Sequence, residues 1–189
     1  MKKLMMIAAL MVATLSVNAQ KMFIKPMVGG TLATLAGDVE NNKMKIGLVA
    51  GAEFGYNINE MFTVTAGALY SMQGSGVKDV DDKMKLDYLN IPVLANVYVA
   101  PGLAVKAGAQ FGFMMSGKYG DTDIKNHLEK FDFSIPLGVS YEISDFVIDA
   151  RYNLGLSNLV KKDFRAMFDS DAKARNSVIM LTVGYKIPF

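Results

Sequence analysis

A repeated alternation of apolar with small or polar residues, with a period of two, is the feature that most constrains the fold. In residues 45–57 the residues between the apolar positions are mostly glycine or polar, and the apolar set is Ile46, Leu48, Ala50, Ala52, Phe54 and Tyr56. The same pattern recurs in residues 103–118, 130–143 and 146–157. Because successive side chains of a β-strand point to opposite faces, the pattern predicts strands that each have one apolar face.

Four further segments alternate more weakly and bring the predicted number of strands to eight. They are residues 22–32, 62–73, 86–99 and 176–189. The connections alternate in length: the short turns are 57–60, 100–102 and 144–145, and the long polar loops are 33–44, 74–85, 117–129 and 158–175. Outer-membrane barrels have short periplasmic turns and longer extracellular loops, so this order predicts such a barrel.

Some residues fit this pattern poorly. Pro26, Pro92 and Pro136 fall inside predicted strands, where a missing N–H breaks the hydrogen-bond ladder, so we expect a bulge or local distortion at each. Lys25 falls on the set assigned as apolar in the first strand, which makes the faces of that strand the hardest to assign.

Eight alternating strands could also form a soluble barrel whose apolar face surrounds a ligand. A water-facing surface would be rich in Lys, Glu and Thr, whereas the polar face here is mostly Gly, Ser and Ala with isolated charges. Small residues suit the interior of an eight-stranded barrel, and lipid requires an apolar band with aromatic girdles. We therefore predict an all-β fold, an eight-stranded antiparallel transmembrane β-barrel, closed because an open sheet edge would leave backbone groups unpaired in hydrocarbon.

The N-terminus has the pattern of a secretory signal peptide. Lys2 and Lys3 precede an apolar run, and small residues end at Ala19, which predicts a signal peptide at 1–19 and a barrel domain at 20–189. Its removal leaves 18 of the 20 Lys and Arg residues against 18 Asp and Glu, so nucleic acid is not an expected partner. The chain has no cysteine, which excludes a disulfide or a thiolate metal site.

The last strand ends on an aromatic residue and has apolar residues at alternate positions before it, including Tyr185, Ile187 and Phe189. This resembles the C-terminal signal of bacterial outer-membrane proteins that the barrel-assembly machinery recognises. Together with the signal peptide, it predicts that the protein is located in the cell outer membrane.

The isolated charges of the small-residue face point into the predicted lumen. We predict a structural polar network there, formed by Glu53, Lys106, Asp132, Asp149 and Arg151, because charges in a dry interior must be paired. The alternative is a continuous water-filled channel lined by the same residues.

Two chemical alternatives are weaker. The histidine of the chain, His127, lies near Ser116, Asp121 and Asp123, but one histidine in a polar loop is not evidence of a catalytic triad. Three acids that suggest calcium lack the glycine and glutamate spacing of an EF-hand loop: Asp79, Asp81 and Asp82. We therefore predict no catalytic residue, no cofactor and no metal site.

Beyond the C-terminal signal, the chain resembles the PorT-like outer-membrane β-barrel family. The resemblance rests on FIKPMVGGTLATL (23–35), ALYSMQGSG (68–76), LDYLNIPVLANVYV (86–99), GLAVKAGAQFGFMMSGK (102–118) and FDFSIPLGVSYEI (131–143). It covers nearly all of 20–189 and includes the prolines of NIPVL and SIPLG. The resemblance implies the fold and the location rather than an activity.

The expected function is structural or interaction-based, through the extracellular loops. The expected partners are outer-membrane lipid, the barrel-assembly machinery during insertion, and an envelope or host protein at the loops. The alternatives are a narrow channel, an accessory component of an envelope transport or secretion system, and a lipid-modifying enzyme.

Overall fold

The computed structural model describes residues 21–37, 42–77, 83–119, 122–123, 128–158 and 174–189. Residues 1–19, interpreted above as a signal peptide, lie outside this part of the chain. The described part is built of strands: β1 (Met22–Gly37), β2 (Asn42–Asn57), β3 (Phe62–Val77), β4 (Lys83–Ala100), β5 (Leu103–Tyr119), β6 (Thr122–Asp123), β7 (Phe131–Ile143), β8 (Phe146–Gly155), β9 (Ala174–Tyr185) and β10 (Ile187–Pro188). The described residues contain no helix long and apolar enough to cross a membrane.

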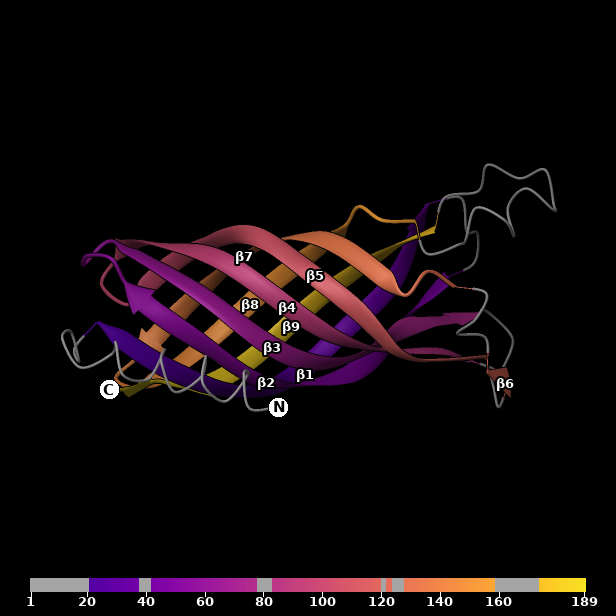
Figure 1. The fold of residues 1–189 in the computed structure, drawn as a ribbon, viewed down its shortest axis with the longest axis horizontal. Coiled ribbons are helices and arrows are strands. Elements are labelled where there is room, and N and C mark those ends of the chain that lie inside the picture. The colour runs from indigo at the N-terminus through magenta and orange to yellow at the C-terminus, as the bar shows by residue number, and fades with distance from the viewer. Residues whose placement is uncertain (1–20, 38–41, 78–82, 120–121, 124–127, 159–173) are drawn as a thin grey trace, which may run out of the picture.

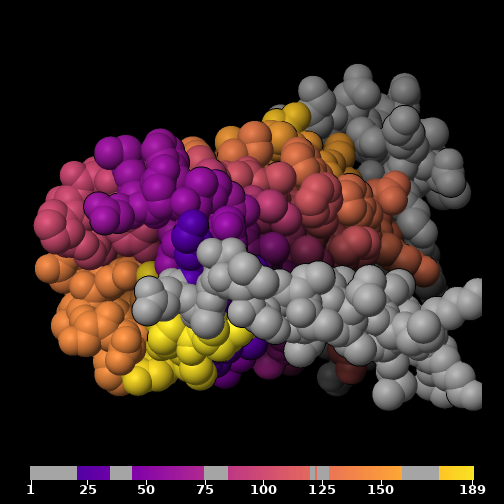
Figure 2. All heavy atoms as spheres, turned by 60° about the vertical axis from the view of Figure 1, so that its left-hand side comes forward, coloured from indigo at the N-terminus to yellow at the C-terminus, as the bar shows by residue number. Residues whose placement is uncertain are grey.

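The strands form one closed antiparallel barrel. Each pairs with the next in the order β1-β2-β3-β4-β5-β7-β8-β9, and β1 pairs with both β9 and β10, which closes the sheet (Figure 1). β9 and β10 are one strand interrupted at Lys186, and β6 is a short addition to β5, so eight barrel strands lie in the described residues. In Figure 2 the C-terminal strand, in yellow, lies beside orange residues that include its neighbour β8. The predicted fold class is confirmed.

Several strands are longer than the alternation predicted. Residues 33–37, 42–44, 74–77 and 83–85, which were assigned to long loops, continue β1 to β4. Backbone pairs such as Ala36↔Arg175 and Gly76↔Lys83 hold these extensions. Alternation marks a strand only where one face meets lipid and the other a packed lumen. It is lost where a strand rises into water, so the predicted loop boundaries were wrong there.

The three prolines interrupt pairing on one side without shifting the register. Around Pro92, the β3–β4 pairs stop at Ala66↔Val93 and resume at Leu69↔Asn90 in the same register, while Pro92 stays opposite Gln110 of β5. Pro136 interrupts the β5–β7 pairs, and Pro26 interrupts the pairs of β1 with β9 and β10, in the same way. The register shifts lie elsewhere, for example between Asp87 and Tyr88. The expected distortion is therefore a local gap in the ladder rather than a bulge.

The outer surface of the barrel is an apolar band with aromatic residues at both ends. On β7, Phe131 near the long-loop end and Tyr141 near the short-turn end are 46% and 50% exposed. Ten residues at about 3.4 Å each, tilted by about 40°, span about 25 Å, which is the height of the apolar band of outer-membrane barrels. Phe113 packs edge-on against Phe131 at 5.7 Å between ring centroids, and Phe146 against Tyr185 at 5.1 Å.

In the first strand the faces are the reverse of those first assigned. Lys25, Phe23 and Met27 are buried and face the lumen, whereas Ile24 and Val28 are exposed. Lys25 lies opposite Glu53 in the β1–β2 register. The faces were assigned wrongly because Lys25 alternates with Phe23 and Met27, which we assigned to the lipid-facing side, whereas the lumen holds both charged and apolar side chains.

Candidate functional site: the filled lumen

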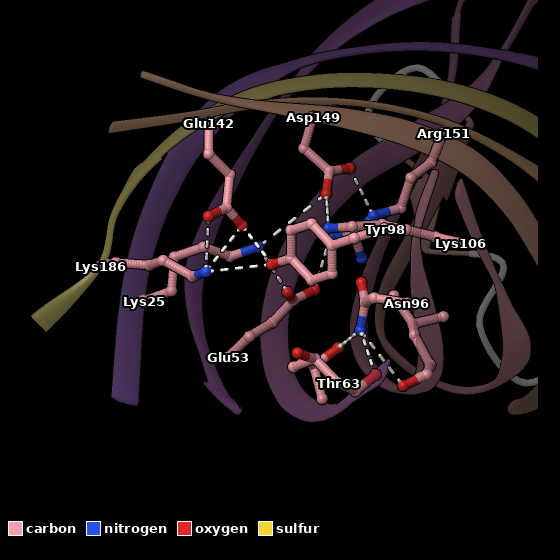
Figure 3. Close-up of polar contacts among 12 residues, drawn as sticks. Lys25, Glu53, Thr63, Asn96, Tyr98, Lys106, Glu142, Asp149, Arg151 and Lys186 are labelled. Atoms are coloured by element: carbon pink, nitrogen blue, oxygen red, sulfur yellow. Dashed lines mark hydrogen bonds and ion pairs between the residues drawn. The ribbon is translucent and has the colours of Figure 1, made fainter. Parts of the chain in front are cut away.

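Five charged side chains meet inside the barrel, and we call them the central ion cluster. They come from β1, β2, β5 and β8: Lys25, Glu53, Lys106, Asp149 and Arg151. The Glu53 carboxylate is 2.8 Å from Lys25 Nζ and 2.6 Å from Arg151 Nη2. Asp149 accepts from Arg151 Nε at 2.6 Å and is paired with Lys106, with Lys25 Nζ at 3.9 Å (Figure 3). The cluster is buried, and each charge has an opposite charge beside it.

The alternation of β2, β5 and β8 directs these charges inward, and glycines make room for them. A Cβ added at Gly67 would lie 2.7 Å from Glu53 Cγ, and one at Gly138 would lie 3.0 Å from Arg151 Cγ. Long charged side chains can therefore fold across the lumen because the neighbouring strand has no side chain at that height. Sequence reasoning missed Lys25. The signal available was that an unpartnered lysine in an apolar band would be costly in lipid.

A second polar group closes the lumen near the short turns, and we call it the periplasmic cluster. It consists of Tyr98, Glu142 and Lys186. Lys186 Nζ donates to both Glu142 oxygens at 2.7 and 2.8 Å and lies 4.5 Å from the centre of the Phe23 ring. Both members of the ion pair are 18% exposed, so this end is partly hydrated. Figure 3 shows this cluster next to the central one.

Apolar side chains fill further parts of the interior. Met27, Val49, Leu69 and Met180 form one buried group contributed by strands on both sides of the seam. Nearer the long-loop end, a second group forms what we call the apolar cap, with Leu128 packed on its edge: Leu86, Tyr88 and Met114. The lumen is therefore a packed core that contains both polar and apolar groups.

Four polar side chains lie beside these apolar groups, with Gln73 opposite Leu86 and Asn90 opposite Leu69 in the strand register, and we call them the outer polar layer. They are Gln73, Asn90, Asp132 and Asn176, all at most 5% exposed. Asn176 Nδ2 donates to Gln73 Oε1 at 2.8 Å, and Asn90 and Asp132 lie on either side of Gly112. Asp132 was predicted to join the charge network, but the structure places it here, away from the central ion cluster. Within the described residues Asp132 has no ion pair, and Asp132 Oδ1, Asn90 Nδ2 and Asn176 Oδ1 have no hydrogen-bond partner.

The predicted C-terminal signal lies on the outside of the barrel at its short-turn end. Tyr185, Ile187 and Phe189 are 41%, 44% and 42% exposed. The Phe189 ring lies 5.9 Å from that of Phe54, which is on the same outer face of β2.

The residues of the weaker chemical alternatives are largely outside the described part of the chain. This holds for His127, Asp121, Asp79, Asp81 and Asp82. Ser116 is half-buried in β5. Asp123, in β6, pairs through its backbone with Lys118 of β5. No cluster of His, Cys, Asp and Glu suited to a metal ion occurs among the described residues.

A closed barrel with a lipid-facing apolar band and a filled polar lumen defines an integral outer-membrane β-barrel protein. The family comparison agrees: a sequence model of the outer membrane protein beta-barrel domain matches residues 11–161. The chain belongs to this family, and its location is the outer membrane. The comparison with curated proteins gives no match.

Solved structures of small outer-membrane barrels are similar in fold. Neisserial surface protein A is 16% identical with a TM-score of 0.61, covering 87% of this chain and 97% of that one. Ail of Yersinia pestis is 18% identical with a TM-score of 0.53, covering 88% and 99%. OprG from Pseudomonas aeruginosa is 14% identical with a TM-score of 0.50, covering 89% and 96%.

Proposed function

We propose that this protein is a non-conducting membrane scaffold that acts through its extracellular end. The observation that supports the proposal is the filled lumen, in which the periplasmic cluster, the central ion cluster and the apolar cap follow one another along the axis. The buried charges pair with one another rather than facing an open site. The interior therefore contributes stability, and the extracellular segments are left to make contacts with an envelope or host protein.

The first test of this proposal is electrical. The purified barrel in a planar lipid bilayer is expected to show no steady conductance, because an ion would have to displace buried salt bridges. Large, steady single-channel currents would contradict the scaffold.

The second test compares protein contacts at the two ends of the barrel in living cells. It places a photo-cross-linking residue at position 165 or at the periplasmic turn position 144. Specific adducts at 165 and none at 144 are expected.

The second candidate is a narrow channel or an accessory component of an envelope transport or secretion system. It is favoured by the outer polar layer, where buried polar atoms of Asn90, Asp132 and Asn176 lack hydrogen-bond partners among the described residues. Such groups are ordinarily satisfied by water, and water in the outer half of the lumen would shorten the barrier to a permeating ion. Conductance that rises when the central ion cluster is removed, but not when the apolar cap is trimmed, would favour this candidate.

Catalysis is not part of the proposal. A lipid-modifying enzyme of this size would need His127 near an acid and a serine, and His127→Ala is expected to leave lipid A unchanged. Altered lipid A in the variant strain would restore the enzymatic alternative. No cofactor is proposed.

We further propose that residues 1–19 are cleaved on secretion and that the C-terminal residues are read by the barrel-assembly machinery. The outward positions of Tyr185, Ile187 and Phe189 support this proposal, because they are available before the barrel closes. Phe189→Ala is expected to lower the fraction of heat-shifted, folded protein in outer membranes. Unchanged insertion would contradict it.

Within the family, we propose a PorT-like affiliation. Its support is the set of segments quoted above, including NIPVL and SIPLG, whose prolines each interrupt pairing with one neighbour. A sequence profile built from PorT-like proteins is expected to match most of 20–189, and failure to match would contradict the affiliation.

A further inference from the structure

Two lysines face each other across neighbouring strands on the outside of the barrel. Lys85 of β4 and Lys118 of β5 are direct partners in the antiparallel register, and both are exposed. Cβ atoms of directly opposite residues lie about 4.5–5.5 Å apart, and like charges in such a pair destabilise the sheet. On the other side of β4, Lys85 lies opposite Gly74, which has no side chain.

The pair faces outward, where the membrane surface lies. Leu86, Tyr88 and Asn90 are buried in the lumen, so Lys85 shares the outer face of β4 with Val93. Leu89 and Phe113 are opposite each other in the same pair of strands, and Phe113 belongs to the aromatic girdle. Leu89 lies four positions from Lys85, which at about 3.4 Å per residue and a tilt of about 40° is about 10 Å along the barrel axis.

That height matches the polar part of the outer leaflet. The headgroup region is about 5–8 Å thick on each side of the hydrocarbon. A lysine side chain can bend back along its aliphatic stem, which brings its ammonium group into this region. Both ammonium groups can therefore reach the level of lipid phosphates above the girdle.

Two acids lie near the pair in the strand register. Asp87 lies two positions from Lys85 on the same face of β4, opposite Met72 of β3. Asp123 occupies the register position opposite Lys118 in the β5–β6 pairing. Among the described contacts, neither lysine has an ion pair.

We propose that Lys85 and Lys118 form a binding site for a phosphate group of an outer-leaflet lipid. The bound phosphate offsets the repulsion between the two ammonium groups and fixes a lipid against the β4–β5 wall. The site is independent of any protein partner at the extracellular segments.

The test uses the full chain, expressed to the outer membrane and purified in neutral detergent. Native mass spectrometry measures retention of added lipid A, of the same lipid A after phosphatase treatment, and competition by inorganic phosphate. The wild type is expected to retain phosphorylated lipid A. Lys85→Ala/Lys118→Ala should lower its affinity about 30-fold, or about 2 kcal/mol for two lysines near a membrane surface.

Stability without lipid provides the second readout, measured as the midpoint of the heat-shift on a gel. Lys118→Ala should unfold at the same temperature as the wild type or higher, because a repulsive neighbour has been removed. A lower midpoint would indicate an internal ion pair, for example with Asp123, and would overturn the proposal. Lys85→Arg/Lys118→Arg should keep the lipid.

Arg175 is the matched control, since it is an exposed cation at the same end of the barrel that lies opposite Ala36 rather than another cation. Arg175→Ala is expected to leave lipid retention unchanged. Three results would overturn the proposal: equal retention by the double alanine variant, equal retention of dephosphorylated lipid A, or full displacement by millimolar inorganic phosphate, which would indicate a free-anion site instead.

Discussion

The central ion cluster and the outer polar layer are both buried in the same lumen, yet they are built differently. In the central cluster each of the five charges lies near an opposite charge, at distances such as 2.6 Å between Arg151 and Glu53. In the outer layer Asp132 has no ion pair among the described residues, although buried atoms without a hydrogen-bond partner occur in both groups, for example Glu53 Oε1 and Asp132 Oδ1. Burial alone therefore does not determine how well a lumen residue is satisfied.

The difference follows from which strands contribute cations. Lys25, Lys106 and Arg151 all project inward near the short turns, where they surround two carboxylates. Farther along the axis, the inward positions near Asp132 carry amides and hydroxyls instead. Because an unpaired buried charge costs far more than an unpaired amide, the first region should hold the barrel together and the second should tolerate change.

The largest expected effect comes from removing the arginine that binds both carboxylates. Arg151→Met leaves Glu53 and Asp149 with two lysines between them and should lower the free energy of unfolding by about 3–5 kcal/mol. Urea unfolding in lipid vesicles measures this. Arg175→Met, at an exposed position, should change it by less than about 0.5 kcal/mol. Similar losses in both variants would remove the contrast.

Replacing one carboxylate in each region compares them directly. Asp149→Asn weakens contacts with Lys106 and Arg151 and should cost about 2–3 kcal/mol, as expected for hydrogen bonds to charged groups. Asp132→Asn removes a charge that has no ion pair and should change stability by less than about 1 kcal/mol, in either direction. The same unfolding titration serves for both, and a larger loss from Asp132→Asn would reverse the comparison.

Glycine substitutions test packing in the two regions. A Cβ at Gly138 would lie 2.5 Å from the Ala150 carbonyl oxygen and 3.1 Å from Arg151 Cα, both backbone atoms. A Cβ at Gly112 would lie 3.0 Å from Asn90 Oδ1, which can rotate away. Gly138→Ala should therefore cost about 2 kcal/mol and Gly112→Ala clearly less. The heat-shift midpoints of the two variants would rank these losses. Equal midpoints would show that the outer polar layer is packed as tightly as the central ion cluster.

The periplasmic cluster is expected to give the smallest effect. Lys186→Met removes an ion pair whose members are 18% exposed, so the expected loss is about 1 kcal/mol. Because this pair is partly hydrated, the difference in the free energy of unfolding between Lys186→Met and the wild type should shrink in 1 M salt. A salt-independent loss of several kcal/mol would group this cluster with the central one.

The strands and their faces were largely predictable, because lipid on one side and a narrow lumen on the other impose alternation on every strand. Glu53, Lys106, Asp149 and Arg151 could be assigned to the lumen from that alternation alone. Strand extensions such as 33–37 and 74–77 could not be predicted, because a strand needs no alternation of apolar and polar residues where it extends beyond the membrane. Lys25 was missed because its strand also carries apolar residues inward.

By itself, the sequence determined which side chains face the lumen in every strand but the first, and where the short turns lie, since a period of two is a local property of each strand. Only the tertiary structure decided which lumen residues meet. Closure with a fixed register brings Lys25 of β1 to Glu53 of β2 and to Asp149 of β8, across the seam between the first and last strands. The same register places Asp132 apart and sets Lys85 opposite Lys118, and such pairings between strands depend on a stagger that no single strand encodes.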